Sequence, residues 1–281
     1  MYKAYFHLKR NPFDLTPDPH CFVPTPRHNE ALAALYYGVR RHKGFVVVTG
    51  EVGTGKTLLL RCLLRLLENS KDIAYAYLFN SRLSPTDFLQ YVLSDFGLQA
   101  SGKNKCELLL DLSKFLVERG SKQLTSVVIV DEAHDLSADT LEELRLLSNL
   151  ETAEEKLVQI ILAGQPELDK KLDSFELRQL KQRIALRTQL GALSAKQTLE
   201  YIEQRLRIAG AESSQPPIFS AQAIDQVYSY SRGFPRLINT ICENALISAY
   251  ARQSPTVSAR IIEDVATEFR LEAFAPVQQN S

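Results

Sequence analysis

The stretch GEVGTGKT, residues 50–57, is a glycine-rich octapeptide between two segments of opposite character. Before it, residues 45–48 (FVVV) form an apolar, mostly β-branched run that is typical of a buried strand. After it, residues 58–69 (LLLRCLLRLLEN) contain strong helix formers and neither glycine nor proline. Strand, glycine loop and helix in this order predict a phosphate-binding loop rather than a simple turn, because loop N–H groups and a helix N-terminus together hold an anion.

The side chains of this loop have separate predicted roles. Gly50 and Gly55 are expected to let the backbone curl so that successive N–H groups point at the anion. Lys56 is expected to reach the β- and γ-phosphates, and Thr57 to offer its hydroxyl to Mg²⁺. The predicted nucleotide contacts are Gly50, Glu51, Val52, Gly53, Thr54, Gly55, Lys56, Thr57 and Leu58.

An acidic pair follows a second apolar run in TSVVIVDEAHDL, residues 125–136. Residues 127–130 read as a strand buried on both faces of a parallel sheet, so Asp131 emerges at the carboxyl end, where ligands bind in such sheets. Asp131 is predicted to hold Mg²⁺ together with Thr57, and Glu132 to polarise the attacking water. The letters DEAH also occur in helicases, but those proteins need two tandem nucleotide-binding cores, and only one fits here.

Two further strands are expected to complete the site with polar residues at their ends. Residues 73–79 precede Asn80, and residues 157–163 precede Gly164 and Gln165. Gln165 is predicted to sense the γ-phosphate from between the acidic strand and the phosphate loop, the alternative being a loop glutamine without a role. Asn80 could hold Glu132 away from water until a partner arrives.

The last third of the chain reads as helical. Ser194 and Gln197 form a capping box before a helix that stops at Gly210, Ser220 caps a shorter helix, and residues 235–251 form another. Ser258 begins a last helix with an apolar stripe.

Composition narrows the class of function. Lys and Arg total 33, as do Asp and Glu, and this balance argues against a chain that depends on non-specific nucleic-acid binding. The four cysteines (Cys21, Cys62, Cys106, Cys242) lie far apart, which favours reduced core thiols over a disulfide framework or metal site. No apolar run approaches the roughly 20 residues of a membrane span, so a cytoplasmic protein is expected.

Several segments together carry a family resemblance: NPFDLTPDP, HNEALAALYYGV, GFVVVTGEVGTGKT, VIVDEAHDL, LEELRLLSNL, ILAGQPEL, LRQLKQRI and GFPRLIN. From about residue 2 to 270, their order and spacing resemble the AAA+ ATPases, and more closely the ATPase module of the general secretion pathway protein A (ExeA-like) family. The resemblance implies an α/β P-loop NTPase of AAA+ type, with a parallel five-stranded sheet flanked by helices and a small all-helical lid.

The domain boundaries expected from this resemblance follow the chain in order. Residues 1–190 would form the nucleotide-binding α/β domain, including an N-terminal adenine-covering segment over residues 1–43. Residues 191–270 would form the helical lid, and residues 271–281 a disordered tail.

The resemblance also implies site residues outside the loop. Asn11, Pro12 and Phe13 resemble the segment that closes over the adenine. RQLKQRIALR, residues 178–187, resembles the stretch with the arginine finger that a neighbouring subunit receives, with Arg183 as first choice and Arg178 as second. GFPR resembles the sensor-2 motif, in which Pro235 begins a helix and Arg236 points at the nucleotide.

The resemblance implies Mg²⁺-dependent ATP hydrolysis by an ATP-dependent homo-oligomer that acts on a secretion or envelope partner. The chain would be cytoplasmic, or held peripherally at the inner membrane through that partner. Members of the family carry a membrane span and a peptidoglycan-binding region after the ATPase; this chain stops before either, so the cell-wall role is not carried over. His134 stands where many relatives have Gln, beyond the acidic pair, and hydrolysis is expected to survive.

Two alternatives remain open. The module also resembles DNA-transposition regulators, and the basic residues of RQLKQRIALR would suit DNA, although the neutral composition disfavours it. The second alternative is a nucleotide switch that binds ATP and scarcely hydrolyses it, although the presence of Glu132 favours an enzyme.

Overall fold

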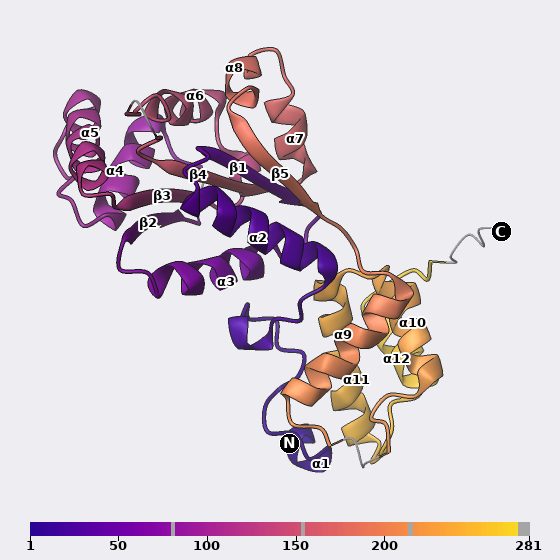
Figure 1. Ribbon diagram of the computed structural model, residues 1–281. Coiled ribbons are helices and arrows are strands. Elements are labelled where there is room, and N and C mark those ends of the chain that lie inside the picture. Colours follow the sequence, from indigo (N-terminus) through magenta and orange to yellow (C-terminus); the bar gives the residue numbers. More distant parts are fainter. Residues whose placement is uncertain (80–81, 153–154, 213–215, 275–281) are drawn as a thin grey trace. The chain divides into compact units, whose positions relative to one another are not determined.

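The computed structural model describes residues 1–79, 82–152, 155–212 and 216–274 (Figure 1). The chain divides into two compact units. The α/β unit comprises Pro26–Val52 and Lys56–Leu190, and the helical unit comprises Met1–Thr25, Gly53–Gly55 and Gly191–Ser281.

The α/β unit is built on a five-stranded sheet with strand order β2-β3-β4-β1-β5, and every pairing between neighbouring strands is parallel. The parallel five-stranded sheet expected from the sequence is therefore confirmed. The strands are β1 (Phe45–Gly50), β2 (Ile73–Leu78), β3 (Thr125–Val130), β4 (Gln159–Gly164) and β5 (Ile184–Leu190).

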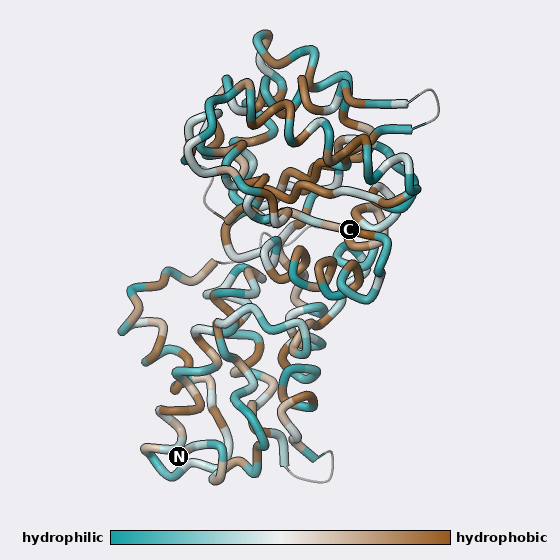
Figure 2. The backbone as a smooth tube through the Cα atoms, turned by 90° about the vertical axis from the view of Figure 1, so that its left-hand side faces the viewer, coloured by the Kyte–Doolittle hydropathy of each residue, from teal (hydrophilic) through white to brown (hydrophobic). Residues whose placement is uncertain are grey.

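Helices cover both faces of this sheet, which explains the continuous apolar runs in its central strands. Every residue of β1, β3 and β4 is buried, whereas the edge strands β2 and β5 are partly exposed. Figure 2 shows the hydrophobic stretches gathered in the strands. In Figure 1, α2 (Pro26–Arg40) and α3 (Lys56–Glu68) cover one face. The other face carries α4 (Pro85–Asp95), α5 (Lys105–Ser121), α6 (Ala138–Leu147), α7 (Pro166–Leu172) and α8 (Arg178–Lys181).

The register brings the functional strand ends to one edge of the sheet. Thr49 of β1 pairs with Gly164 of β4, and Val130 of β3 pairs with Leu162 of β4. The segments that follow β1, β3 and β4 therefore leave the sheet side by side, with β4 in the middle. This is the carboxyl edge, where ligands bind in open parallel sheets.

The helical unit contains α1 (Tyr2–Tyr5), the 3₁₀ turn η1 (Pro19–Cys21), α9 (Ala195–Ile208), α10 (Ala221–Ser231), α11 (Pro235–Ala251) and α12 (Ala259–Glu268). Both hydrogen bonds of the predicted capping box of α9 are present, between Ser194 and Gln197. Ser220 caps α10, and Pro235 begins α11, as the sequence predicts.

Gly233 is required at the turn between α10 and α11. Its φ is +76°, and a Cβ there would collide with the main chain of Leu193. The Leu193 N–H also donates to the Gly233 carbonyl at 2.8 Å. Only glycine fits a left-handed residue with a neighbouring backbone so near.

Residues 1–25 group with the helical unit, whereas the family resemblance implies that they belong to the α/β domain. Phe13 is fully buried and packs edge-on against Phe219, with ring centroids 5.9 Å apart. The buried guanidinium of Arg205 on α9 donates to the carbonyl of Pro12 at 2.5 Å. Buried aromatic area and charge-assisted hydrogen bonds hold the segment against these helices.

Candidate nucleotide-binding site

The phosphate-loop candidate lies between β1 and α3, as the sequence predicts. Gly53 and Gly55 adopt the left-handed φ values of +82° and +98° that glycine allows, whereas Gly50 is the last residue of the strand. The curl of the loop is therefore made by Gly53 and Gly55 rather than by Gly50 and Gly55. Of the other predicted loop contacts, Glu51 and Val52 are exposed, Thr54 is buried, and Leu58 is half-buried on α3.

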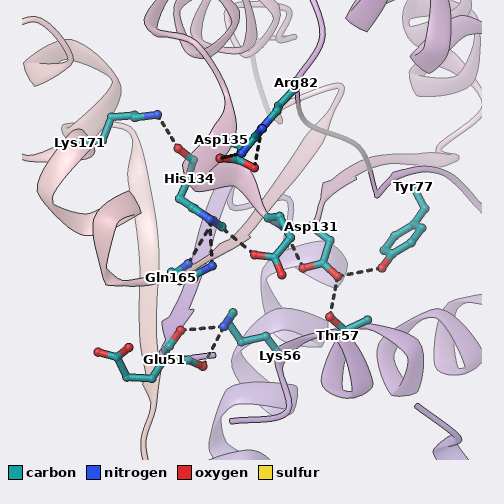
Figure 3. A network of polar contacts seen from close by, with 12 residues as sticks. Glu51, Lys56, Thr57, Tyr77, Arg82, Asp131, His134, Asp135, Gln165 and Lys171 are labelled. Carbon is teal, nitrogen blue, oxygen red and sulfur yellow. Dashed lines mark hydrogen bonds and ion pairs between the residues drawn. The ribbon is translucent and has the colours of Figure 1, made fainter. Parts of the chain in front are cut away.

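Lys56 is the buried cation of this loop. Its ammonium donates to the carbonyls of Gly50 at 2.7 Å and Glu51 at 3.0 Å (Figure 3). Burial lowers the pKa of the Lys56 ammonium, and the negative charges of Glu132 and Asp131 oppose that shift. The site thus holds a desolvated cation beside two carboxylates, an arrangement that suits an anionic ligand with a metal ion.

Asp131 connects three elements through its carboxylate. Its Oδ2 accepts hydrogen bonds from the Thr57 hydroxyl at 2.8 Å and from the Tyr77 phenol at 3.1 Å, and its Oδ1 accepts from the main-chain N–H of Glu132 at 2.9 Å. Burial, and next the charge of Asp131, raise the pKa of the Tyr77 phenol. Tyr77 therefore stays protonated and acts as a fixed donor to the carboxylate.

Glu132 has a left-handed backbone conformation, with φ 51° and ψ 38°, where it caps the 3₁₀ turn η2 (Ala133–Asp135). This conformation costs a non-glycine residue on the order of 1–3 kcal/mol and is concentrated at functional sites. Because β3 ends at Val130, the turn places the acidic pair and His134 at the carboxyl edge of the sheet.

His134 lies between Glu132 and Gln165. Its Nδ1 is 3.3 Å from Oε2 of Glu132, and its Nε2 is 3.0 Å from Nε2 of Gln165. Gln165 follows β4 directly and is the N-cap residue of α7, so it sits between the acidic turn and the phosphate loop, as expected from the strand order.

Two features fix the backbone of the acidic turn. The Lys171 ammonium on α7 donates to the carbonyls of His134 at 2.5 Å and Leu136 at 2.7 Å. At Gly164, a Cβ would lie 3.2 Å from the main-chain nitrogen of His134. The absence of a side chain at Gly164 therefore permits the close approach of the turn to β4.

The two finger candidates have different surroundings. Arg183, between α8 and β5, is half-buried and donates to the Ser148 hydroxyl at 2.7 Å and to the Arg145 carbonyl at 3.3 Å. Arg178 is exposed, and its guanidinium stacks on the exposed ring of Phe175, 4.0 Å from the ring centroid. Both side chains thus have contacts within the α/β unit.

The remaining candidates lie in the helical unit or outside the described residues. Asn11 is exposed, whereas Pro12 and Phe13 are buried in the helical unit. Pro235 is half-buried, and Arg236 is exposed on the first turn of α11. The main-chain N–H of Arg236 donates to the Gly53 carbonyl at 3.2 Å, and Gly53 belongs to the same compact unit. Asn80 lies outside the described residues, as do residues 275–281 of the predicted tail.

Sequence reasoning missed three residues of this network: Tyr77, His134 as a contact of Glu132, and Lys171. Tyr77 had a usable signal, because it lies three residues before Asn80 on a strand predicted to end at the site. Lys171 had none, since its contacts depend on how α7 packs against η2.

Comparisons with known proteins agree with this fold. A family model described as an AAA domain matches residues 39–172. General secretion pathway protein A of Aeromonas hydrophila is 44% identical over 255 residues, which cover 90% of this chain and 46% of that protein. The chain thus spans about half the length of this curated relative.

Two solved structures share the fold at low identity. The Aeropyrum pernix ORC2 protein, in ADPNP–ADP complexes, is 17% identical with a TM-score of 0.68, covering 95% of this chain and 73% of its own. Cdc6p from Pyrobaculum aerophilum is 18% identical with a TM-score of 0.70, and the match covers 92% of this chain and 70% of the Cdc6p chain.

The parallel sheet, the glycine loop after β1 and the acidic turn after β3 give this chain the fold of P-loop NTPases of the AAA class. Within this class, the chain resembles the ATPase module of the general secretion pathway protein A (ExeA-like) family. In the described part of the chain, no helix has the length and apolar character needed to cross a membrane.

Proposed function

We propose that this protein binds ATP with Mg²⁺ and hydrolyses it, and that hydrolysis drives a conformational change in the protein or in a partner. The observation that carries the proposal is the contact between the Thr57 hydroxyl and the buried Asp131 carboxylate, 2.8 Å, next to Lys56 and Glu132. It joins the helix after the glycine loop to the end of the acidic strand, which are the two halves of a phosphoryl-transfer site.

Thr57 and Asp131 suit Mg²⁺ because a hydroxyl and a carboxylate are hard oxygen ligands. Together they would hold the ion, which supplies charge neutralisation on the phosphates when bound. The chain's own groups do the rest. Lys56 would exchange its loop carbonyls for phosphate oxygens, and Glu132 would accept a proton from the attacking water. Gln165 would orient the γ-phosphate.

Loss of nucleotide binding on substitution of Lys56 is the direct test. Lys56→Ala removes the only buried ammonium that the described loop residues present, so ATP affinity in the presence of Mg²⁺ is expected to fall about 10- to 100-fold. Titration calorimetry would measure it, with Lys114→Ala as the control because its side chain is 77% exposed on α5. Equal ATP affinity in the parent and Lys56→Ala would overturn the proposed site.

A second prediction concerns Tyr77 and the Mg²⁺ concentration that the ATPase requires. Tyr77→Phe deletes the phenol that donates to Asp131 Oδ2 and leaves the ring in place. A residue that orients a metal ligand contributes about 10- to 100-fold to metal affinity. We expect the Mg²⁺ concentration for half-maximal ATPase activity to rise by at least about 10-fold. Tyr75→Phe is the matched control, because the Tyr75 phenol donates to Glu68 instead. An unchanged Mg²⁺ titration in Tyr77→Phe would show that the phenol plays no part.

The proposed setting is a bacterial secretion or envelope system reached through a partner protein, with the chain cytoplasmic or peripheral at the inner membrane. The name and 44% identity of the Aeromonas hydrophila protein support it, although that protein is about twice as long as the matched region. The proposed working form is an ATP-dependent homo-oligomer with Arg183 as its finger, Asn11, Pro12 and Phe13 near the adenine, and Pro235 and Arg236 as sensor 2. Asn80 remains the proposed restraint on Glu132.

DNA binding is the less favoured function. Two basic side chains of the stretch after α7 pair with acidic side chains: Lys181 pairs with Asp173 at 2.9 Å, and Arg187 lies 3.6 Å from Asp169. Carboxylates thus neutralise part of the positive charge that this stretch could offer to phosphates. We expect no ATP-dependent shift of duplex DNA in a gel at low salt, and a salt-sensitive shift would revive this alternative.

A further inference from the structure

The His134 ring contacts the two side chains with the most direct roles in the proposed hydrolysis. Its Nδ1 is 3.3 Å from the Glu132 carboxylate and its Nε2 is 3.0 Å from the Gln165 amide nitrogen, as the dashed lines of Figure 3 mark. Only 14% of the His134 side chain is exposed. One ring thus bridges the proposed base and the proposed γ-phosphate sensor.

The chemistry of these contacts determines the tautomer of the ring. An amide nitrogen can donate but not accept, so Nε2 of His134 must accept from Gln165, and the ring proton resides on Nδ1. Oε2 of Glu132 lies 3.3 Å from this nitrogen, an electrostatic contact rather than an aligned hydrogen bond. The main-chain N–H of Gln165 also donates toward Nδ1, but at 3.5 Å this contact is longer and weaker than the 3.0 Å contact of Nε2.

This tautomer orients both partners. The Gln165 amide is held with its nitrogen toward the ring, which uses one N–H and leaves the second to meet a phosphate oxygen. Oε2 of Glu132 faces the ring at 3.3 Å, and the other carboxylate oxygen can accept a proton from water. A change in the position of either partner is transmitted through the ring to the other.

We propose that His134 is a positioning residue that couples γ-phosphate sensing by Gln165 to water activation by Glu132. The proposal rests on the proposed ATPase function and adds a residue to it. The backbone supports the role, because Lys171 holds the His134 carbonyl at 2.5 Å and the turn packs on Gly164. The ring therefore projects from a fixed point, as a positioning side chain requires.

Steady-state kinetics of four variants test the coupling: His134→Ala, His134→Gln, Gln165→Ala and the double variant His134→Ala/Gln165→Ala. His134→Ala should lower kcat by about 10- to 100-fold while the ATP dissociation constant changes less than about threefold. His134→Gln should recover most of the lost activity, because the new amide can accept from Gln165 and donate to Glu132.

The double variant separates coupling from packing. If His134 acts through Gln165, His134→Ala/Gln165→Ala should be about as slow as Gln165→Ala alone. Three results would each overturn the proposal. In the first, the kcat losses of the two single variants multiply in the double variant. In the second, His134→Gln recovers no activity, and in the third, His134→Ala loses ATP affinity as much as it loses kcat. Were His134→Ala to unfold, His134→Gln and Gln165→Ala would still decide between these outcomes.

A spectroscopic readout keeps the proposal separate from the ATPase function on which it rests. Imidazole ¹⁵N signals of the parent without nucleotide, assigned by comparison with His134→Gln, should show the ring proton on Nδ1 rather than on Nε2. Gln165→Ala should remove this preference. An Nε2–H ring in the parent would overturn the bridge even if ATP is hydrolysed. A parent that hydrolyses no ATP but shows the Nδ1–H ring would instead count against the proposed function and retain the contact.

Discussion

Glu132→Gln is expected to lower kcat for ATP hydrolysis by about 100- to 10,000-fold, the usual contribution of a general base. The substitution preserves the shape of the side chain beside His134, but it removes the group that takes the proton from water. ATP affinity should remain within about threefold of the parent, since a lost general base leaves ground-state contacts in place. The variant should therefore retain ATP for long periods.

Rapid quench with labelled ATP measures the chemical step, and filter retention measures the bound nucleotide. Glu118→Gln is the matched control, because Glu118 is 68% exposed on α5 and pairs only with Lys122 among the ion pairs of the described chain. A Glu132→Gln protein with parental kcat would remove Glu132 from the mechanism and leave the nucleotide-switch alternative in place.

Arg183→Ala should have the larger effect on an assembled protein, about 1,000- to 100,000-fold in kcat, if its guanidinium stabilises the transition state in a neighbouring subunit. In the structure Arg183 donates to Ser148 and to the Arg145 carbonyl, so it would have to exchange these partners on assembly. Arg178→Ala provides the matched comparison, since Arg178 is the exposed second candidate.

Mixing the two inactive variants distinguishes a shared site from a local one. Each Glu132→Gln subunit would carry an intact finger, and each Arg183→Ala subunit an intact base, so a mixture should regain activity that neither shows alone. Activity should also rise with protein concentration, as light scattering detects assembly. If mixing restores nothing and Arg183→Ala lowers the melting temperature of the monomer, Arg183 acts only in holding α6.

The parts of the site that are contiguous in the chain could be predicted from sequence. Residues 50–57 and 127–132 carry the loop and the acidic strand as unbroken segments, and their strand or helix context is local. The contacts between segments could not be predicted, because they depend on register and packing. Tyr77 reaches Asp131 because Leu78 pairs with Val130.

Backbone conformation limited the prediction at His134. Counting along the chain puts His134 beyond the acidic pair, but the left-handed Glu132 turns the chain so that the His134 ring lies back against Glu132 and Gln165. Periodicity says nothing about a single left-handed residue that is not glycine.

The same limit applies to the N-terminal segment. Its apolar residues predict burial but not the partner, and Phe13 packs with Phe219 in the helical unit.

The N-terminal segment also has a consequence for synthesis on the ribosome. Pro12 bonds to a residue 193 positions later, and the Tyr2 phenol to Glu243, 241 positions later. Such long loops close slowly, and nascent chains fold as domains emerge. The N-terminal segment must therefore wait, with Phe13 uncovered, until Phe219 and Glu243 have been translated. Its apolar side chains are the natural target for chaperones during that interval, and a chain truncated near residue 190 would never bury them.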